Sequence, residues 1–144
     1  MNDKKYCFYG NENATKVVAP DNEYGVKTPL DLYDRLLQIW SINTCAPRLR
    51  PDWSCSNPTL GQCSITAFLV QDIFGGEVYG VKTGNGVHCY NVVNGISFDL
   101  TSEQFGDKAK DLDYTPILKQ DREAPNHFGN GEKRDRYLLL KSSL

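Results

Sequence analysis

The sequence lacks a long hydrophobic run and a strong excess of charge of either sign. Among its 144 residues, no apolar stretch approaches the ~20 residues that a membrane helix needs. The polar start MNDKKYCFYGNENATK also lacks the apolar core of a secretory signal, so we expect a cytoplasmic protein that does not bind membranes. Sixteen Lys and Arg against 18 Asp and Glu leave a net charge of -2, which argues against nucleic acid as a partner.

The sequence also lacks the cysteine spacing of a disulfide framework or a zinc ribbon. The five cysteines form an odd set without any CxxC pair, at positions 7, 45, 55, 63 and 89. A scattered zinc site from Cys55, Cys63, His88 and Cys89 is unfavourable, because neighbours in a strand point to opposite faces. We therefore predict no metal and no cofactor, and at least one free thiol.

The length indicates one domain over residues 1–144. Residues 1–27 mix polar residues with short apolar pieces, and we expect a loosely organised arm or short strands there, with little function. Residues 28–106 form the expected core, and residues 107–144 a C-terminal extension that is polar at first and ends in a helix over 131–141. No internal repeat or low-complexity segment occurs.

Two segments precede the centre of the expected core. Thr28 as a cap, Pro29 at the first helical position and apolar residues at helical spacing predict a helix over 29–41. Residues 43–60 contain three prolines and predict a long irregular connection. Connections of this length inside a compact domain often carry function.

The most informative stretch is 61–76, GQCSITAFLVQDIFGG. It predicts an almost wholly apolar, buried helix that begins near Gln62 or Cys63 and ends at Gly75-Gly76. A cysteine in the first turn of a helix experiences partial positive charge and unpaired N–H groups, which favour the reactive thiolate. The stripe Cys63, Ala67, Val70 and Phe74 should face the element on which the helix packs.

After this helix, β-branched and aromatic residues predict strands over 77–83, 87–93 and 96–100. Gly84-Asn85-Gly86 is read as a turn, and Asn94-Gly95 as a two-residue hairpin loop. That loop sets the register as Val93 with Ile96, Val92 with Ser97, Asn91 with Phe98, and Tyr90 with Asp99. Asp99 then becomes the diagonal neighbour of His88, close enough for a hydrogen bond.

These elements suggest a thiol nucleophile, a base and an orienting carboxylate in Cys63, His88 and Asp99. In the alternative interpretation both residues are purely structural: Cys63 fills space in the core, and His88 is a strand histidine whose hydrogen bonds are satisfied. His127 is read as a loop residue and Cys89 as a core residue on the opposite sheet face from His88. Two arginines in the irregular connection either recognise a carboxylate or are solvated charges, namely Arg48 and Arg50.

The motif Gly61-Gln62-Cys63, a strand His88 and then Asp99 is similar to the transglutaminase-like branch of papain-like cysteine enzymes. The longer pattern, from about residue 40 to 105, resembles the bacterial YunG-like family, with weaker similarity around Arg122-Glu123 and Arg136-Tyr137. The resemblance implies an α+β papain-like fold, with a central helix that opens at the cysteine and packs on a small antiparallel meander between flanking helices. It implies no established activity, and it does not imply protein crosslinking.

The resemblance also suggests residue roles. Cys63 corresponds to the nucleophile, His88 to the general base and acid, and Asp99 to the residue that orients the imidazole. The Cys63 N–H is one natural oxyanion donor. Further oxyanion or substrate-binding candidates are Asn57, Gln62 and Trp53.

We therefore expect a cysteine-dependent acyl-transfer enzyme that hydrolyses or transfers an amide or ester. Its substrate, whether peptide, protein or small molecule, is not specified by the sequence. The alternative is a catalytically silent module that binds a peptide or metabolite in the same cleft. A deamidase related to toxins or defence proteins is a third reading, which no feature of the sequence favours over the other two.

Overall fold

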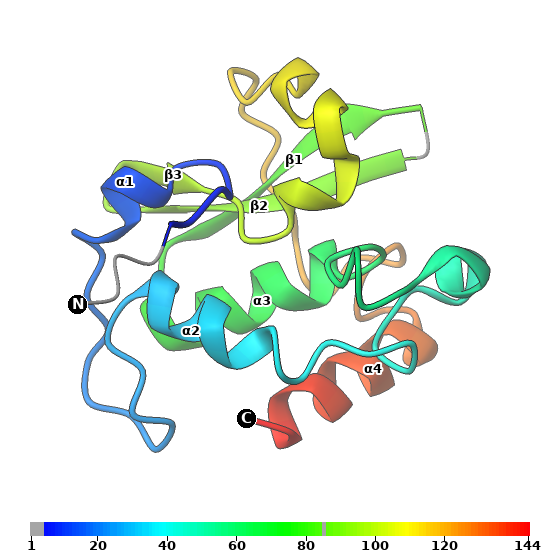
Figure 1. Cartoon of the computed structure of the whole chain (residues 1–144), viewed down its shortest axis with the longest axis horizontal. Helices are drawn as coiled ribbons and strands as arrows, with labels where there is room; N and C mark the ends of the chain where they lie inside the picture. The colour runs from blue at the N-terminus through cyan, green and yellow to red at the C-terminus, as the bar shows by residue number, and fades with distance from the viewer. Residues whose placement is uncertain (1–4, 85) are drawn as a thin grey trace.

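The computed structural model describes residues 5–84 and 86–144. It is a mixed α+β structure with a small antiparallel sheet, as expected, and Figure 1 shows helix α3 lying between that sheet and helices α2 and α4. The elements in chain order are α1 (Asn11–Ala14), α2 (Pro29–Leu36), η1 (Pro47–Asp52), α3 (Cys63–Phe74), β1 (Glu77–Thr83), β2 (Gly86–Val93), β3 (Ile96–Phe98), η2 (Ser102–Asp111) and α4 (Gly131–Ser142). The η elements are 3-10 helices.

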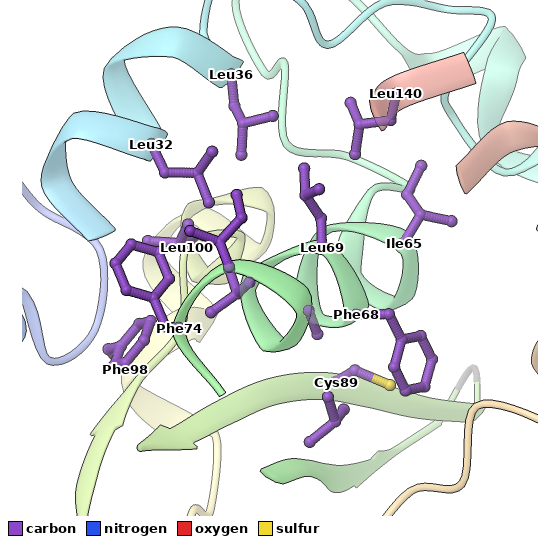
Figure 2. Close-up of a cluster of buried hydrophobic side chains, with 14 of the residues drawn as sticks. Leu32, Leu36, Ile65, Phe68, Leu69, Phe74, Cys89, Phe98, Leu100 and Leu140 are labelled. Atoms are coloured by element: carbon purple, nitrogen blue, oxygen red, sulfur yellow. The ribbon is translucent and has the colours of Figure 1, made fainter. Parts of the chain in front are cut away.

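Helix α3 confirms the predicted central helix and is buried along most of its length. It ends where Gly75 takes a φ of 82°, a value that glycine adopts without steric cost. One side of α3 packs on β2, where Asn91 Nδ2 donates to the Ala67 carbonyl at 2.9 Å. On its other side, Ile65 and Leu69 lie toward Leu36 and Leu140 of the flanking helices, as Figure 2 shows. The helix is therefore apolar all round because it is covered on both sides.

The sheet has the strand order β1-β2-β3, and the predicted hairpin register is confirmed for residues 91–93 against 96–98. Asn94 and Gly95 form the loop with φ values of 51° and 79°. The predicted pair Tyr90–Asp99 is wrong, because β3 ends at Phe98 and Asp99 bridges Tyr9 instead. The predicted turn at 84–86 includes Asn85, which lies outside the described residues, and β2 already begins at Gly86.

The predicted helix over 29–41 is shorter than expected. A reciprocal capping box between Thr28 and Asp31 starts α2, as the sequence indicates, but the helix ends at Leu36. The Leu36 carbonyl accepts from the N–H groups of both Ile39 and Trp40, at 2.9 and 2.8 Å, which tightens the chain into turns. The predicted strand 96–100 is also shorter, because β3 ends at Phe98. The 3-10 segment η2 follows it. The final helix α4 matches its prediction within one residue.

The N-terminal segment is more ordered than predicted. Phe8 and Val17 are buried and belong to the same hydrophobic core as α3, and Tyr9 N donates to Ser102 Oγ at 2.9 Å. Sequence pattern does not reveal this packing, because single apolar residues at irregular spacing produce no periodicity. This packing bears on the site, because the Asp99 N–H donates to the Tyr9 carbonyl at 2.9 Å.

Among the described residues, no helix combines the length and the apolar character that crossing a bilayer requires.

We expect that Gly76→Ala destabilises the protein strongly. A Cβ at Gly76 would lie 2.4 Å from the Val92 carbonyl oxygen, and the residue has a φ of 74°. Overlap with main chain adds to the cost of a left-handed alanine, so we expect a loss of about 3 kcal/mol or more in urea unfolding. Gly95→Ala is the matched control, because φ is 79° but nothing lies within 4 Å, and about 1 kcal/mol is expected. Equal losses in the two variants would contradict the close approach of Gly76 to β2.

Candidate active site

Cys63 is the first residue of α3 and borders a cavity of about 370 Å³. The chain bends into the helix at Gly61, whose φ is 73° and whose Cβ, if present, would lie 2.5 Å from Cys45 Sγ. The N-cap residue of α3 is Gln62, and its side chain makes no capping hydrogen bond. The first-turn N–H groups therefore remain available to a negatively charged atom at this end of the helix.

His88 lies on β2, is buried, and contacts Asp99 directly. The distance from His88 Nε2 to Asp99 Oδ2 is 2.6 Å, and the edge of the ring packs against Phe105 at a centroid distance of 4.8 Å. The buried Nδ1 atom has no hydrogen-bond partner of ordinary geometry in the described part of the chain, although the Cys63 side chain interacts with the ring. One nitrogen is thus held by a carboxylate and the other is left for the thiol.

Asp99 is 1% exposed and both of its carboxylate oxygens are occupied. Oδ1 accepts from Thr101 N at 3.1 Å and Thr101 Oγ1 at 3.3 Å, while Oδ2 accepts from Tyr114 OH at 2.7 Å in addition to His88. Tyr114 is stacked on Tyr9, with ring centroids 3.8 Å apart. These contacts fix the carboxylate, and through it the imidazole.

Tyr114 is a site residue that the sequence reasoning missed. It lies in the polar stretch between η2 and α4, which predicts no regular element. A single aromatic residue in such a stretch has no spacing that links it to a carboxylate 15 residues earlier. The contact is evident only in the folded structure, where the Tyr114 ring is stacked on Tyr9 and its hydroxyl donates to Asp99.

The electrostatics of the site favour a thiolate and an imidazolium. Hydrogen bonds from Cys89 and the His88 side chain outweigh burial and hold the pKa of Cys63 well below its usual value. Burial lowers the pKa of His88, but the Asp99 carboxylate and the Cys63 side chain together raise it to about 10. The pKa of Cys89, in contrast, is raised well above its usual value by the neighbouring Cys63 and by burial. The negative charge therefore resides on Cys63.

The contact between Cys63 and Cys89 was not expected. Cys89 is indeed a core residue, and Figure 2 shows it beside Phe68. However, β3 pairs only with residues 91–93, so it leaves the preceding part of that β2 edge uncovered. Cys63 interacts there with both the thiol and the backbone N–H of Cys89, and it also reaches His88. A thiol at the edge of a strand can meet side chains from both of its faces.

The three side chains proposed for the oxyanion site do not line the cavity. Gln62 Nε2 donates to the Ser41 carbonyl at 3.1 Å, Trp53 Nε1 to the Pro58 carbonyl at 3.1 Å, and Asn57 Nδ2 to the Gln104 carbonyl at 3.3 Å. Each therefore supports the loop structure around the site. The sequence offset from Cys63 does not determine where a side chain in an irregular loop points.

His127 lies in a turn, as predicted, and it is buried. Its Nε2 contacts Gln120 Oε1 at 2.9 Å, and its ring packs edge-on against Phe68. Burial and the nearby Lys133 lower the pKa of His127 to about 4, so the ring is neutral at physiological pH. Across residues 5–84 and 86–144, no group of three or more His, Cys, Asp or Glu side chains is suitably arranged for a metal ion.

Comparison with known proteins gives one family and one curated relative. The model of a family described as YunG protein matches residues 28–144. An uncharacterized protein YunG from Bacillus subtilis (strain 168) is 39% identical over 70 residues, which are 49% of this chain and 56% of that protein. The chain thus spans little more than half the length of this relative. No solved structure matches the chain.

We expect that Asp99→Asn raises the pH at which Cys63 becomes reactive. In the unmodified protein, the iodoacetamide rate constant at Cys63 should rise with pH through a midpoint below the ~8.5 of a free thiol, because an imidazolium favours the thiolate. Asparagine removes the charge that raises the His88 pKa, so the imidazole becomes neutral and the midpoint should rise by about one unit or more. The measurement is the pH profile of alkylation, followed by peptide mass spectrometry.

The matched control is Asp113→Asn, since the Asp113 carboxylate binds Thr115 rather than His88. Its profile should coincide with that of the unmodified protein. An Asp99→Asn midpoint that does not move would show that the carboxylate does not govern the charge of the pair.

Proposed function

We propose that this chain, which belongs to the YunG family, is a cysteine-dependent acyl-transfer enzyme with a transglutaminase-like, papain-like site. One observation carries the proposal: the His88 imidazole contacts the Asp99 carboxylate through one nitrogen and interacts with the Cys63 side chain, although the three residues come from different parts of the chain. Helix α3, which opens with the cysteine, packs on the antiparallel strand that carries the histidine. This order of elements supports the papain-like interpretation of the coarser α+β fold.

The geometry supports a two-step reaction through a thioester. The Cys63 thiolate attacks the carbonyl carbon of an amide or ester, so that a C–S bond forms and the carbonyl π electrons move to oxygen. The Cys63 N–H and its neighbours in the first turn of α3 are placed to stabilise that oxyanion. When the carbonyl re-forms, the bond to the amine or alcohol breaks, and the leaving group takes the proton of His88.

In the second step, neutral His88 removes a proton from water or from an acceptor amine or alcohol. That nucleophile attacks the thioester carbon, the C–S bond breaks, and the product leaves as an acid, amide or ester. The thiolate and the imidazolium are thereby regenerated. Asp99 keeps the imidazole oriented throughout, as its hydrogen bonds to Thr101 and Tyr114 support.

A thiolate nucleophile must stay reduced, and all five cysteines are free. We therefore place the enzyme in the cytoplasm, where thiols are kept reduced. The catalytically silent binding module remains the second candidate, because none of the three predicted oxyanion side chains lines the cavity. The two candidates differ in whether Cys63 forms a covalent intermediate.

We expect p-nitrophenyl acetate to acylate Cys63. The protein should release a burst of p-nitrophenol, and acid quenching should trap an acetyl thioester on the peptide that contains Cys63. Cys63→Ser should abolish both signals, because the serine hydroxyl is not ionised at neutral pH. His88→Ala should slow acylation by about 100-fold, within the range typical of general acid–base groups.

The exposed Cys55 is the internal control, since it is not among the described residues that line the cavity, and Cys55→Ser should leave the burst unchanged. Acetylation spread over Cys7, Cys55 and Cys63 at similar rates would refute the enzyme proposal. A Cys63→Ser variant that restores growth or ligand binding as well as the unmodified protein would favour the binding module.

A further inference from the structure

The cavity beside Cys63 is lined by an excess of cationic side chains. Its lining includes Arg48, Lys108, Lys133 and Arg136, and it includes no Asp or Glu among the described residues. The whole chain has more acidic than basic residues, 18 against 16, so this excess is local to the cavity. Clefts lined by one sign of charge concentrate ligands of the opposite sign.

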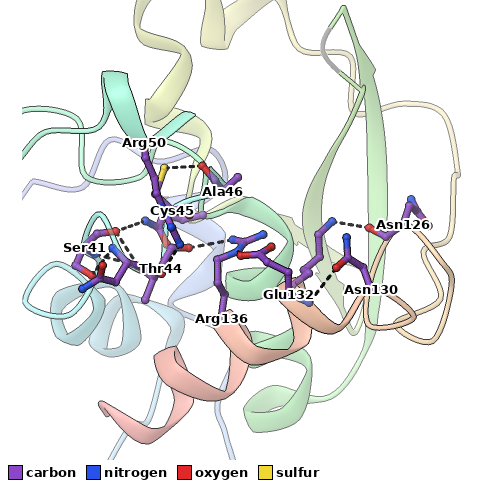
Figure 3. A network of polar contacts seen from close by, with 12 residues as sticks. Ser41, Thr44, Cys45, Ala46, Arg50, Asn126, Asn130, Glu132 and Arg136 are labelled. Atoms are coloured by element: carbon purple, nitrogen blue, oxygen red, sulfur yellow. Dashed lines mark hydrogen bonds and ion pairs between the residues drawn. The ribbon is translucent and has the colours of Figure 1, made fainter. Parts of the chain in front are cut away.

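The two cations on α4 differ in what balances them. Arg136 is buried, and Figure 3 shows it between Glu132 and Thr44: Nε contacts Glu132 Oε2 at 2.8 Å and Nη1 donates to the Thr44 carbonyl at 3.0 Å. Its charge is thus matched, and it holds the wall of the cavity. Lys133 Nζ donates to the Asn126 carbonyl, which is a neutral acceptor, and the lysine interacts electrostatically with Cys63 and Cys89.

The partial burial of Lys133 disfavours its charge and lowers its pKa. An anion in the cavity would compensate for that loss of solvation, whereas a neutral ligand would not. Lys108, on η2, is exposed and contributes a second ammonium group to the same lining. These two lysines are the side chains best placed to select a ligand by charge.

The structure places Arg48 and Arg50, whose role the sequence did not decide, in different environments. Arg48, on η1, lines the cavity. Arg50 donates through Nε to the Cys45 carbonyl and through Nη2 to the Asn43 carbonyl, both at 3.2 Å, and so binds its own loop. The cationic lining therefore draws on η1, η2 and α4, while a loop arginine close in sequence does not contribute.

The lining also includes the apolar side chains of Ala46, Leu49, Leu60, Val87 and Phe105, besides polar residues such as Ser64, Thr83 and Gln104. A volume of about 370 Å³ is near the lower end of the range for small-molecule sites, about 300–1,000 Å³. We propose, building on the proposed function, that the acyl donor is a small molecule that carries a carboxylate, with Lys133 and Lys108 as specificity-determining residues. The apolar side chains then contact the stretch between that carboxylate and the reacting carbonyl.

Two alkylating reagents test this proposal without knowledge of the natural substrate. Iodoacetate and iodoacetamide undergo the same reaction: the thiolate attacks the CH₂ carbon, a C–S bond forms, the C–I bond breaks and iodide leaves. They differ in that iodoacetate carries a carboxylate. The ratio of their rate constants at one cysteine reports attraction for the anion, because the thiolate fraction cancels.

We expect this ratio to be about tenfold or more higher at Cys63 than at the exposed Cys55 of the same molecule, and to fall with added salt. Lys133→Gln and Lys108→Gln should each lower the ratio at Cys63 several-fold, and the double variant should lower it further. His88 is unchanged in these variants, so its own attraction for iodoacetate is constant. Lys141→Gln is the matched control on α4, because Lys141 lies over the Tyr137 ring and does not line the cavity, and it should not change the ratio.

The outcomes separate the two proposals. Equal ratios at Cys63 and Cys55, or a Cys63 ratio that neither lysine variant lowers, would overturn the carboxylate proposal. Iodoacetamide that reacts with Cys63 no faster than with Cys55 would instead overturn the activated thiol. If Lys133→Gln fails to fold by circular dichroism, the exposed Lys108 decides the matter, and an unchanged ratio in Lys108→Gln then refutes the proposal.

Discussion

The buried contact between His88 and Asp99 is the constraint on which the rest of the site depends. A carboxylate that is 1% exposed must replace the hydration it has lost, and it does so through four hydrogen bonds. The donors belong to β2, to the residues after β3 and to the segment before α4. The N-terminal segment also takes part, because Tyr9 pairs with the Asp99 backbone and stacks on Tyr114. Satisfying one charge thus brings together parts of the chain that share no sequence pattern.

The sequence predicted the parts of this arrangement that depend on local signals. Gly75-Gly76 marked the end of α3, and Asn94-Gly95 determined the hairpin register of residues 91–93 against 96–98. Local signals did not predict the packing of the N-terminal segment, the position of Tyr114 or the contact between Cys63 and Cys89, because each of these depends on tertiary packing. The strand pair Tyr90–Asp99 failed for the same reason: the hairpin loop favours it, but Tyr9 competes for the Asp99 backbone.

The oxyanion candidates show a further limit of spacing arguments. Asn57 and Trp53 were suggested by the resemblance, but the segment from 43 to 60 that contains them has turns, a 3-10 helix and a short bridge between Ser54 and Asn57. In such a segment the direction of a side chain changes from residue to residue without a fixed period. The first turn of α3, in contrast, has a geometry that any helix imposes, so its N–H groups are the firmer basis for oxyanion binding.

The charges around Cys63 also relate the chemistry to the ligand. A thiolate and the Asp99 carboxylate against one imidazolium leave the catalytic series with a net negative charge, which repels an anionic acyl donor. Lys133 interacts with Cys63, but burial still lowers its pKa, so its charge is incompletely compensated where it lies. Lys108 adds a further ammonium group to the same lining. A carboxylate on the substrate accounts for both the excess of positive charge and its position beside the thiol.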